Sequence, residues 1–301
     1  MPTSSRGTAL YRSRRSRLVG LAYLAPALLF VLVFTAWPLA QMLWMSLHNW
    51  SLLTPPRFVG LANYRRALTD DQFWVSFAFT LKYTAIITPV LIVGGYLLAL
   101  LTSRPSALRR LARACVFIPV VIGLGVSSLL WYWLFSTDFG LVNRALMDLG
   151  VIARPVLWLG VDADRSNLAI IASVVWKVIG FGMILFVGAI QAIPTEITEA
   201  SLVDGAGYWQ RVTRVILPLT LRTVLLVTLV SVIGSLLAFD QFYIMTAGQP
   251  QNETATSVFY VYLNSFPYLR LGYGAALSMI LALTILAFTV VQLLLTRRSH
   301  A

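Results

Sequence analysis

Six stretches of mostly apolar residues run along the chain, and the short segments between them hold most of the charged residues. A helix needs roughly 20 apolar residues to cross about 30 Å of hydrocarbon. The stretches are too long and too evenly apolar for barrel strands of about 10 alternating residues. The pattern therefore predicts six transmembrane helices, at residues 18–47, 77–101, 111–135, 168–193, 221–245 and 273–296.

The composition supports a membrane protein. Hydrophobic residues make up 58% of the 301 positions, charged residues only 11%, and the mean hydropathy is +0.80. This is typical of a bilayer protein rather than of a soluble domain. We expect an all-α membrane protein in which a basic tail, residues 1–17, precedes a single transmembrane domain, residues 18–301.

The distribution of arginine predicts the orientation. Fourteen arginines flank the N-terminus, the second and fourth loops and the C-terminus, whereas seven flank the other span ends. The positive-inside rule therefore places both termini in the cytoplasm. The net charge of +12 does not indicate nucleic-acid binding, because these arginines lie beside span ends and not in a groove interleaved with aromatic residues.

Residues that could carry out catalysis or bind a metal are scarce. The two histidines, His48 and His300, lie far from any cluster at metal-ligand spacing, and Cys115 is the only cysteine. Neither a GxxxxGK[ST] phosphate loop nor a GxSxG nucleophile elbow occurs. We therefore expect no catalytic residue, no metal and no cofactor in this chain, so that any energy for transport comes from another protein.

The segment between the fourth and fifth spans, residues 193–220, is unusually polar. Thr195 is placed to cap a short helix, and Glu196 and Glu199 lie at its positive end. Gly205 and Gly207 permit a sharp turn before a second short helix over residues 208–215. Two interpretations remain open: a cytoplasmic helix-turn-helix knob that fits a groove on another protein, or a loop that lies on anionic lipid headgroups.

This segment resembles the cytoplasmic EAA loop of permease subunits of binding-protein-dependent ABC importers, whose pattern is EAAxxxGx9IxLP. Glu199, Ala200, Gly205, Leu217 and Pro218 match that spacing. Ser201 replaces the second alanine and Val215 the isoleucine, and both are mild departures.

The resemblance continues along most of the chain and favours the MalF/UgpA-type sugar permeases. The segments that carry it, in order, are FTAWPLAQMLWMSLHNW, FVGLANY, RACVFIP with LWYWLF, WKVIGFGM, IPTEITEASLVDGAGYWQ and FDQFYIMTAGQP. The last is a weaker match, because the family usually has GGP where this chain has Gly248-Gln249-Pro250.

The resemblance implies a divided mechanism in the bacterial inner membrane. Two permease subunits, here this chain and a MalG/UgpE-type partner, form the pathway. A dimeric ATPase that binds ATP and Mg supplies the driving force, and an extracytoplasmic binding protein delivers the substrate. The EAA loop is the coupling helix that docks on the ATPase. The coupling residues implied here are Glu199, Ala200, Ser201, Asp204, Gly205 and Pro218, although Asp204 reads equally well as a solvated carboxylate.

Three ionisable residues lie inside predicted spans, where a charge is costly and often functional. Lys177 and Asp240 lie at similar depth in the fourth and fifth spans. We expect them to line the substrate cavity or to face each other across it, and the alternative is an ion pair that only fixes helix packing. Lys82 lies nearer the surface, where its side chain can extend to the headgroups.

Aromatic and polar residues near this pair suit a sugar, because a pyranose ring has apolar faces and polar edges. The remaining candidates for the substrate pathway are Trp176, Phe181, Ser235, Phe239, Gln241 and Tyr243. Each also reads as a helix-packing or interface residue. The lysine leaves glycerol phosphate esters, which the same family transports, as an alternative substrate.

Two other classes of protein remain as alternatives. An ion-coupled secondary transporter needs its own ion site and usually internal repeat symmetry, and neither is visible. An intramembrane enzyme needs a clustered set of catalytic groups, and only Lys177 and Asp240 are available.

Overall fold

The computed structural model describes residues 14–51 and 53–298, and these form helices apart from one short hairpin. Four helices are long and apolar enough to cross a membrane, and six stretches qualify if each of two bent helix pairs counts as one span. The chain is therefore a mostly helical, multi-pass membrane protein. Most of the predicted basic tail, residues 1–13, lies outside the described residues, and the first helix already begins at Arg14, within that predicted tail.

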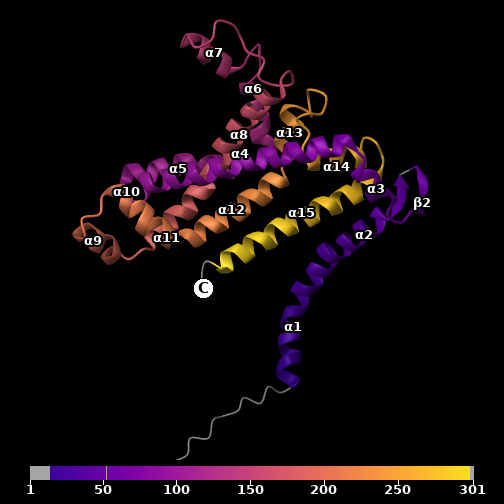
Figure 1. The fold of residues 1–301 in the computed structure, drawn as a ribbon, viewed down its shortest axis with the longest axis horizontal. Helices are drawn as coiled ribbons and strands as arrows, with labels where there is room; N and C mark the ends of the chain where they lie inside the picture. The colour runs from indigo at the N-terminus through magenta and orange to yellow at the C-terminus, as the bar shows by residue number, and fades with distance from the viewer. Residues whose placement is uncertain (1–13, 52, 299–301) are drawn as a thin grey trace, which may run out of the picture.

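The first membrane stretch consists of α1 (Arg14–Val31), the π-helical turn η1 (Leu32–Ala36) and α2 (Trp37–Ser46). A widened turn thus lies between Pro26 of α1 and Pro38 of α2. Its apolar window has no residue buried inside the protein. Figure 1 shows why, since α1 swings away from the other helices.

A small hairpin, absent from the sequence prediction, follows the first span. Strands β1 (His48–Ser51) and β2 (Thr54–Phe58) pair antiparallel, with His48 opposite Phe58. The next helix is α3 (Ala62–Leu68), and its Asn63 amide donates to the carbonyls of Ser46 and His48 at 2.8 and 3.0 Å. These two bonds fix α3 against the end of the span.

The centre of the fold is the pair α4 (Asp71–Thr102) and α8 (Ala163–Gln191). Each begins at an aspartate whose side chain caps it: Asp70 accepts from the Phe73 amide and Asp162 from the Arg165 amide. The helices approach closely because Gly95 faces α8, where an added Cβ would lie 3.3 Å from the Met183 nitrogen. Small residues at such contacts are the usual way in which membrane helices pack.

The sequence predicts one continuous helix for the third span, but the structure has two helices there. Helix α5 (Ala107–Val121) ends two residues after Pro119, and α6 (Leu124–Leu134) leaves at an angle of 101°. Helix α5 nevertheless lies directly on α8, because Gly180 has no side chain to hold them apart. A Cβ at that position would lie 2.3 Å from the Val116 carbonyl oxygen. Beyond α6, the long loop contains one short helix, α7 (Leu141–Asp148).

The fifth predicted helix, residues 221–245, is also interrupted. Helix α12 (Leu221–Leu236) ends nine residues early, and α13 (Asp240–Met245) starts after a break at residues 237–239. The chain then forms α14 (Ser257–Ser265) and the long last helix α15 (Leu271–Arg298). The breaks in the third and fifth spans fall where helices α6 and α13 pack against each other.

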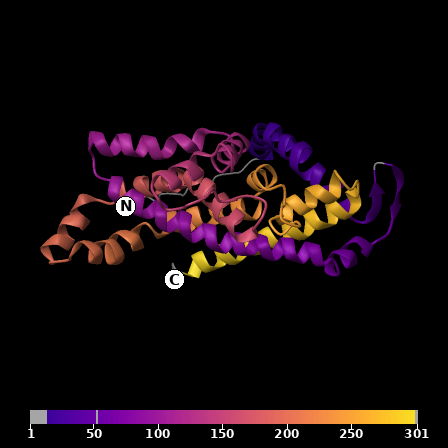
Figure 2. The same cartoon turned by 90° about the horizontal axis from the view of Figure 1, so that it is seen from above.

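The segment that joins α8 to α12 lies at one end of the molecule, and the hairpin lies at the opposite end (Figures 1 and 2). Three short helical pieces and a π turn make up this segment: α9 (Thr195–Val203), α10 (Tyr208–Arg211), η2 (Val212–Ile216) and α11 (Leu217–Leu219). The C-terminal end of α4 and the start of α5 lie at the same end as this segment (Figure 2).

Candidate functional site

The 195–219 segment forms a helix, a tight turn and a second helical stretch. Pro194, and not Thr195, is the residue that precedes the first helix, and no side chain caps it. The turn depends on Gly205, whose φ of +76° is a conformation that other residues adopt at a cost. The amides of Gly205 and Ala206 donate to the carbonyls of Leu202 and Ser201, both at 3.0 Å, which closes the helix as a Schellman motif.

This segment presents an exposed surface that is both apolar and acidic. Leu202, Val203 and Trp209 are exposed, and Val203 keeps 87% of its surface accessible. Glu199 and Asp204 are exposed beside them. Ser201 differs, since it is buried and its hydroxyl donates to the Thr198 carbonyl at 2.7 Å. Exposed apolar side chains grouped on a short rigid element are typical of an interaction surface.

The second candidate is a cavity of about 210 Å³ enclosed by α4, α8, α12 and α13, with Leu124 of α6 at its edge. Five of the predicted pathway residues line it: Phe181, Ser235, Phe239, Asp240 and Gln241. The break at residues 237–239 brings Phe239, Asp240 and Gln241 to this lining, because it turns the start of α13 into the space between α8 and α12. We call this space the interhelical cavity. The five predicted residues offer two aromatic rings, one carboxylate, one amide and one hydroxyl.

Tyr83 of α4 completes the wall of the interhelical cavity and was not predicted from the sequence. Its hydroxyl lies beside the Gln241 side chain, which also lines the cavity. The ring also packs edge-on against Phe242, with ring centroids 5.0 Å apart. A tyrosine inside an apolar span is a weak sequence signal, because most such residues only pack against neighbouring helices.

Lys177 is not among the residues that line the interhelical cavity, and within the described residues it forms no ion pair with Asp240, so the alternative of a packing ion pair is wrong. Its buried ammonium donates to the Val120 carbonyl at 2.8 Å, at the end of α5. Among the described residues, the only ion pair joins Lys82 and Asp164, at 2.9 Å. The lysine therefore donates a hydrogen bond to a carbonyl that the broken helix leaves without an intrahelical partner. Its positive charge also interacts favourably with the negative end of the α5 dipole.

Two further predicted pathway residues, Trp176 and Tyr243, lie outside the cavity lining. Trp176 packs edge-on against Trp131, with ring centroids 5.7 Å apart. Tyr243 stacks on Phe239 at 5.3 Å and is 43% exposed. Lys82 is exposed and bound to Asp164, so it points to the surface.

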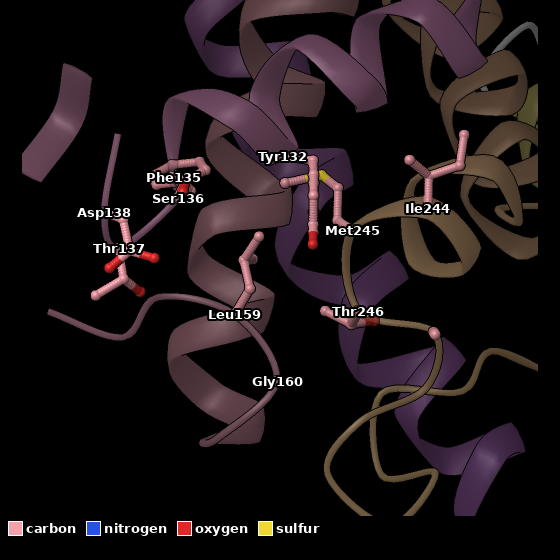
Figure 3. A pocket seen from close by; sticks show the side chains of 11 residues that line it. Tyr132, Phe135, Ser136, Thr137, Asp138, Leu159, Gly160, Ile244, Met245 and Thr246 are labelled. Carbon is pink, nitrogen blue, oxygen red and sulfur yellow. The ribbon is translucent and has the colours of Figure 1, made fainter. Parts of the chain in front are cut away.

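A larger cavity of about 420 Å³ lies between the α6–α7 turn, the 159–160 loop and the end of α13 (Figure 3). Tyr132, Asp138 and Thr246 are among the residues that line it. None of the predicted site residues lines this larger cavity. It is a surface hollow beside the broken helices and is separate from the interhelical cavity.

A shifted carboxylate pKa occurs at Asp70, far along α4 from the cavity. Burial alone would raise the pKa of Asp70, but hydrogen bonds from Tyr273 and Tyr260, the Phe73 amide and the Arg66 charge hold it below its ordinary value. Burial, together with the hydrogen bond to Asp70, raises the pKa of Tyr260 to about 12. This cluster joins the start of α4 to α14 and α15 and is structural.

The comparisons with known proteins identify the class of protein. Residues 91–300 match the family of binding-protein-dependent transport system inner membrane components, and the chain belongs to that family. The trehalose/maltose transport system permease protein MalF of Thermococcus litoralis is 34% identical over 288 residues, which cover 95% of this chain and 96% of that protein. The match confirms the resemblance to MalF-type permease subunits of ABC importers, which are non-catalytic.

Other relatives are equally well covered. The lactose transport system permease protein LacF of Rhizobium radiobacter is 30% identical over 97% of both chains. The trehalose transport system permease protein SugA of Mycobacterium tuberculosis is 30% identical over 95% of this chain and 93% of its own. The fold matches a crystal structure of a bacterial alginate ABC transporter in complex with an alginate pentasaccharide-bound periplasmic protein. The TM-score is 0.84, with 21% identity over 97% of this chain and 98% of that chain.

Proposed function

We propose that this chain crosses the membrane six times and forms half of the pathway for a sugar or sugar derivative in an ATP-driven importer. The observation that carries the proposal is the near-complete coverage by permeases named for trehalose, maltose and lactose. The remaining parts of the importer are a second permease subunit, an ATPase dimer that binds ATP and Mg, and an extracytoplasmic binding protein. Both termini and the 195–219 segment face the cytoplasm, as the arginine distribution indicates.

The 195–219 segment is the part that couples to the ATPase. Its exposed Leu202 and Val203 fill a groove on the ATPase, and the exposed Glu199 carboxylate accepts hydrogen bonds at the rim. Gly205 permits the tight turn, because glycine adopts a positive φ without strain. Because α11 leads directly into α12, a movement of this segment tilts α12 and changes the shape of the interhelical cavity.

Co-purification tests the coupling. Tagged protein is expressed with its ATPase, and wild type is compared with a variant that carries Glu199→Lys and Gly205→Trp. We expect the ATPase to elute with wild type and not with the variant. The matched control is Gly150→Trp, at another exposed, positive-φ glycine with free space around it but in the α7 loop. Equal recovery of the ATPase with all three proteins would contradict the proposal and favour a loop that lies on lipid.

The substrate contacts the interhelical cavity. Phe181 and Phe239 supply apolar faces, and Ser235, Asp240 and Gln241 supply hydrogen bonds to hydroxyl groups. Among the residues that the structure describes, no cation lies within 4 Å of the Asp240 carboxylate, which favours hydroxyl donors over an anionic substrate such as a glycerol phosphate ester. We expect Asp240→Asn to lower sugar uptake at least tenfold, equivalent to about 1.4 kcal/mol, while the variant still co-purifies with the ATPase. Unchanged uptake would remove Asp240 from the site.

A further inference from the structure

Four aromatic rings form a continuous row that starts at the interhelical cavity. Phe239 lines the cavity and stacks on Tyr243, with ring centroids 5.3 Å apart and planes 12° apart. Tyr262 of α14 contacts both, with centroids 5.2 and 5.3 Å from theirs. Phe266 continues the row 5.4 Å beyond Tyr262. We call Phe239, Tyr243, Tyr262 and Phe266 the aromatic strip.

The strip consists of two pairs of residues, each pair one helical turn apart on its own helix. Residues 239 and 243 are one turn apart at the start of α13, and residues 262 and 266 are one turn apart at the end of α14. Beneath them, Phe259 is only 2% exposed and supports the rings of Tyr243 and Tyr262 from the protein side. The row is therefore held from below, while Tyr243 and Phe266 stay 43% and 63% exposed.

The position of the strip argues against a role confined to the lipid interface. Interfacial aromatic residues face outward from a bundle, but the first ring of this row is part of the wall of an internal cavity. The other end is the most exposed ring of the four, at Phe266. A ligand that follows the row passes from the exposed end to the cavity without leaving aromatic contact.

The chemistry of the strip selects the ligand class. Its members carry no charge, their two tyrosine hydroxyls can hydrogen-bond, and the carboxylate at its inner end, Asp240, repels anions. Flat aromatic faces with a few polar groups suit a ring that is apolar on its faces and hydroxylated at its edge. We propose that the aromatic strip is a second subsite, which stacks the pyranose rings of a neutral sugar on their way into the interhelical cavity. The proposal rests on the proposed function, since it concerns an importer of sugars.

Leucine and tryptophan substitutions separate stacking from simple packing. Leucine keeps an apolar side chain at Tyr262 or Phe266 but removes the flat aromatic face, whereas tryptophan keeps the face. If the strip only packs against lipid or against the second permease subunit, leucine serves as well as tryptophan. If it stacks a sugar, only tryptophan does. Tyr268→Leu is the matched control, because Tyr268 is an exposed tyrosine just beyond α14 that contacts only the Arg270 guanidinium among the ring interactions of the described residues.

The experiment uses the complete importer in proteoliposomes, with the binding protein outside and ATP supplied to the ATPase. Uptake of radiolabelled trehalose, maltose, lactose and glycerol 3-phosphate is measured together with ATP hydrolysis, and the sugar moved per ATP is compared. We expect the Tyr262→Leu and Phe266→Leu variants to move about five- to tenfold less sugar per ATP at unchanged hydrolysis. The two tryptophan variants and Tyr268→Leu should stay within about twofold of wild type.

Three results would overturn the proposal. Leucine and tryptophan variants that behave alike would make the strip a packing surface, and a parallel loss of hydrolysis and assembly would place it at the interface with the second permease subunit. Uptake of glycerol 3-phosphate alone would contradict the neutral ligand class. If wild type moves none of the four probes although it hydrolyses ATP, the proposed function itself fails, and this outcome is distinct from a failure of the strip alone.

Discussion

Gly180→Ala should destabilise the protein although it adds only one methyl group. The new Cβ would lie 2.3 Å from the Val116 carbonyl oxygen and 3.0 Å from the Phe117 Cα, and both are backbone atoms that cannot rotate away. Restoring an ordinary contact of at least 3.4 Å requires α5 to move by about 1 Å from α8. Overpacking of this kind costs about 1–3 kcal/mol.

The same movement would break a second contact. The Lys177 ammonium donates to the Val120 carbonyl at 2.8 Å from the neighbouring turn of α8. A shift of about 1 Å exceeds the usual range for this bond, and losing a hydrogen bond to a charged group costs about 1.5–3 kcal/mol. Alanine regains up to about 1 kcal/mol of helix propensity. The expected net loss of stability is about 2–5 kcal/mol.

The assay is unfolding of the purified protein in detergent, followed by tryptophan fluorescence and by size-exclusion chromatography after heating. Gly188→Ala is the control, because Gly188 lies on the same helix with nothing within 4 Å of an added Cβ. Gly188→Ala should be as stable as wild type or slightly more stable, whereas Gly180→Ala should unfold at a clearly lower temperature. Equal stability of the two variants would refute the described α5–α8 contact.

Three further outcomes follow from single contacts. The Lys177→Met variant leaves the Val120 carbonyl without its hydrogen-bond donor and should lower the free energy of unfolding by about 1–3 kcal/mol. The Lys177→Arg variant should lose less stability. Equal losses in the two variants would exclude the hydrogen bond. Because the pKa of Asp70 is lowered in the folded protein, its contribution is present above the unfolded value near pH 3.9 and is lost as the pH falls through the folded pKa. Acid unfolding below about pH 4 should therefore depend less on pH in Asp70→Asn, and identical profiles would contradict this. Lys82→Ala should change stability by less than about 1 kcal/mol, because its pair with Asp164 is exposed; a larger loss would show that the pair is shielded from solvent.

The sequence predicted the long uninterrupted helices within a few residues, because hydrophobic length alone determines them. It did not predict the two breaks. Pro119 and residues 237–239 interrupt stretches that remain apolar throughout, and a hydropathy pattern cannot distinguish a straight helix from a broken one. The hairpin was missed for a related reason, since its strands are four and five residues long and one contains two prolines.

The candidate site was predicted in part. The short helices and the turn at Gly205 follow from local signals, namely acidic residues before a turn glycine. The contact of Lys177 with α5 did not follow from the sequence, because equal depth in two helices does not specify which face each residue occupies. The break after Leu236 rotates Asp240 into the cavity, while Lys177 faces α5. The aromatic strip depends on contacts between α13 and α14, which lie on either side of an irregular loop.

Transport by the reconstituted importer tests the central claim most directly. The proteoliposomes contain this chain, its partner permease subunit and the ATPase. The binding protein is added outside, and ATP is added on the side of the membrane where the ATPase lies. The account predicts sugar uptake that requires ATP, the binding protein and this chain, and that is lost when Glu199→Lys and Gly205→Trp are introduced together. Uptake that persists without ATP, or without the ATPase, would contradict it and show a transporter that works alone.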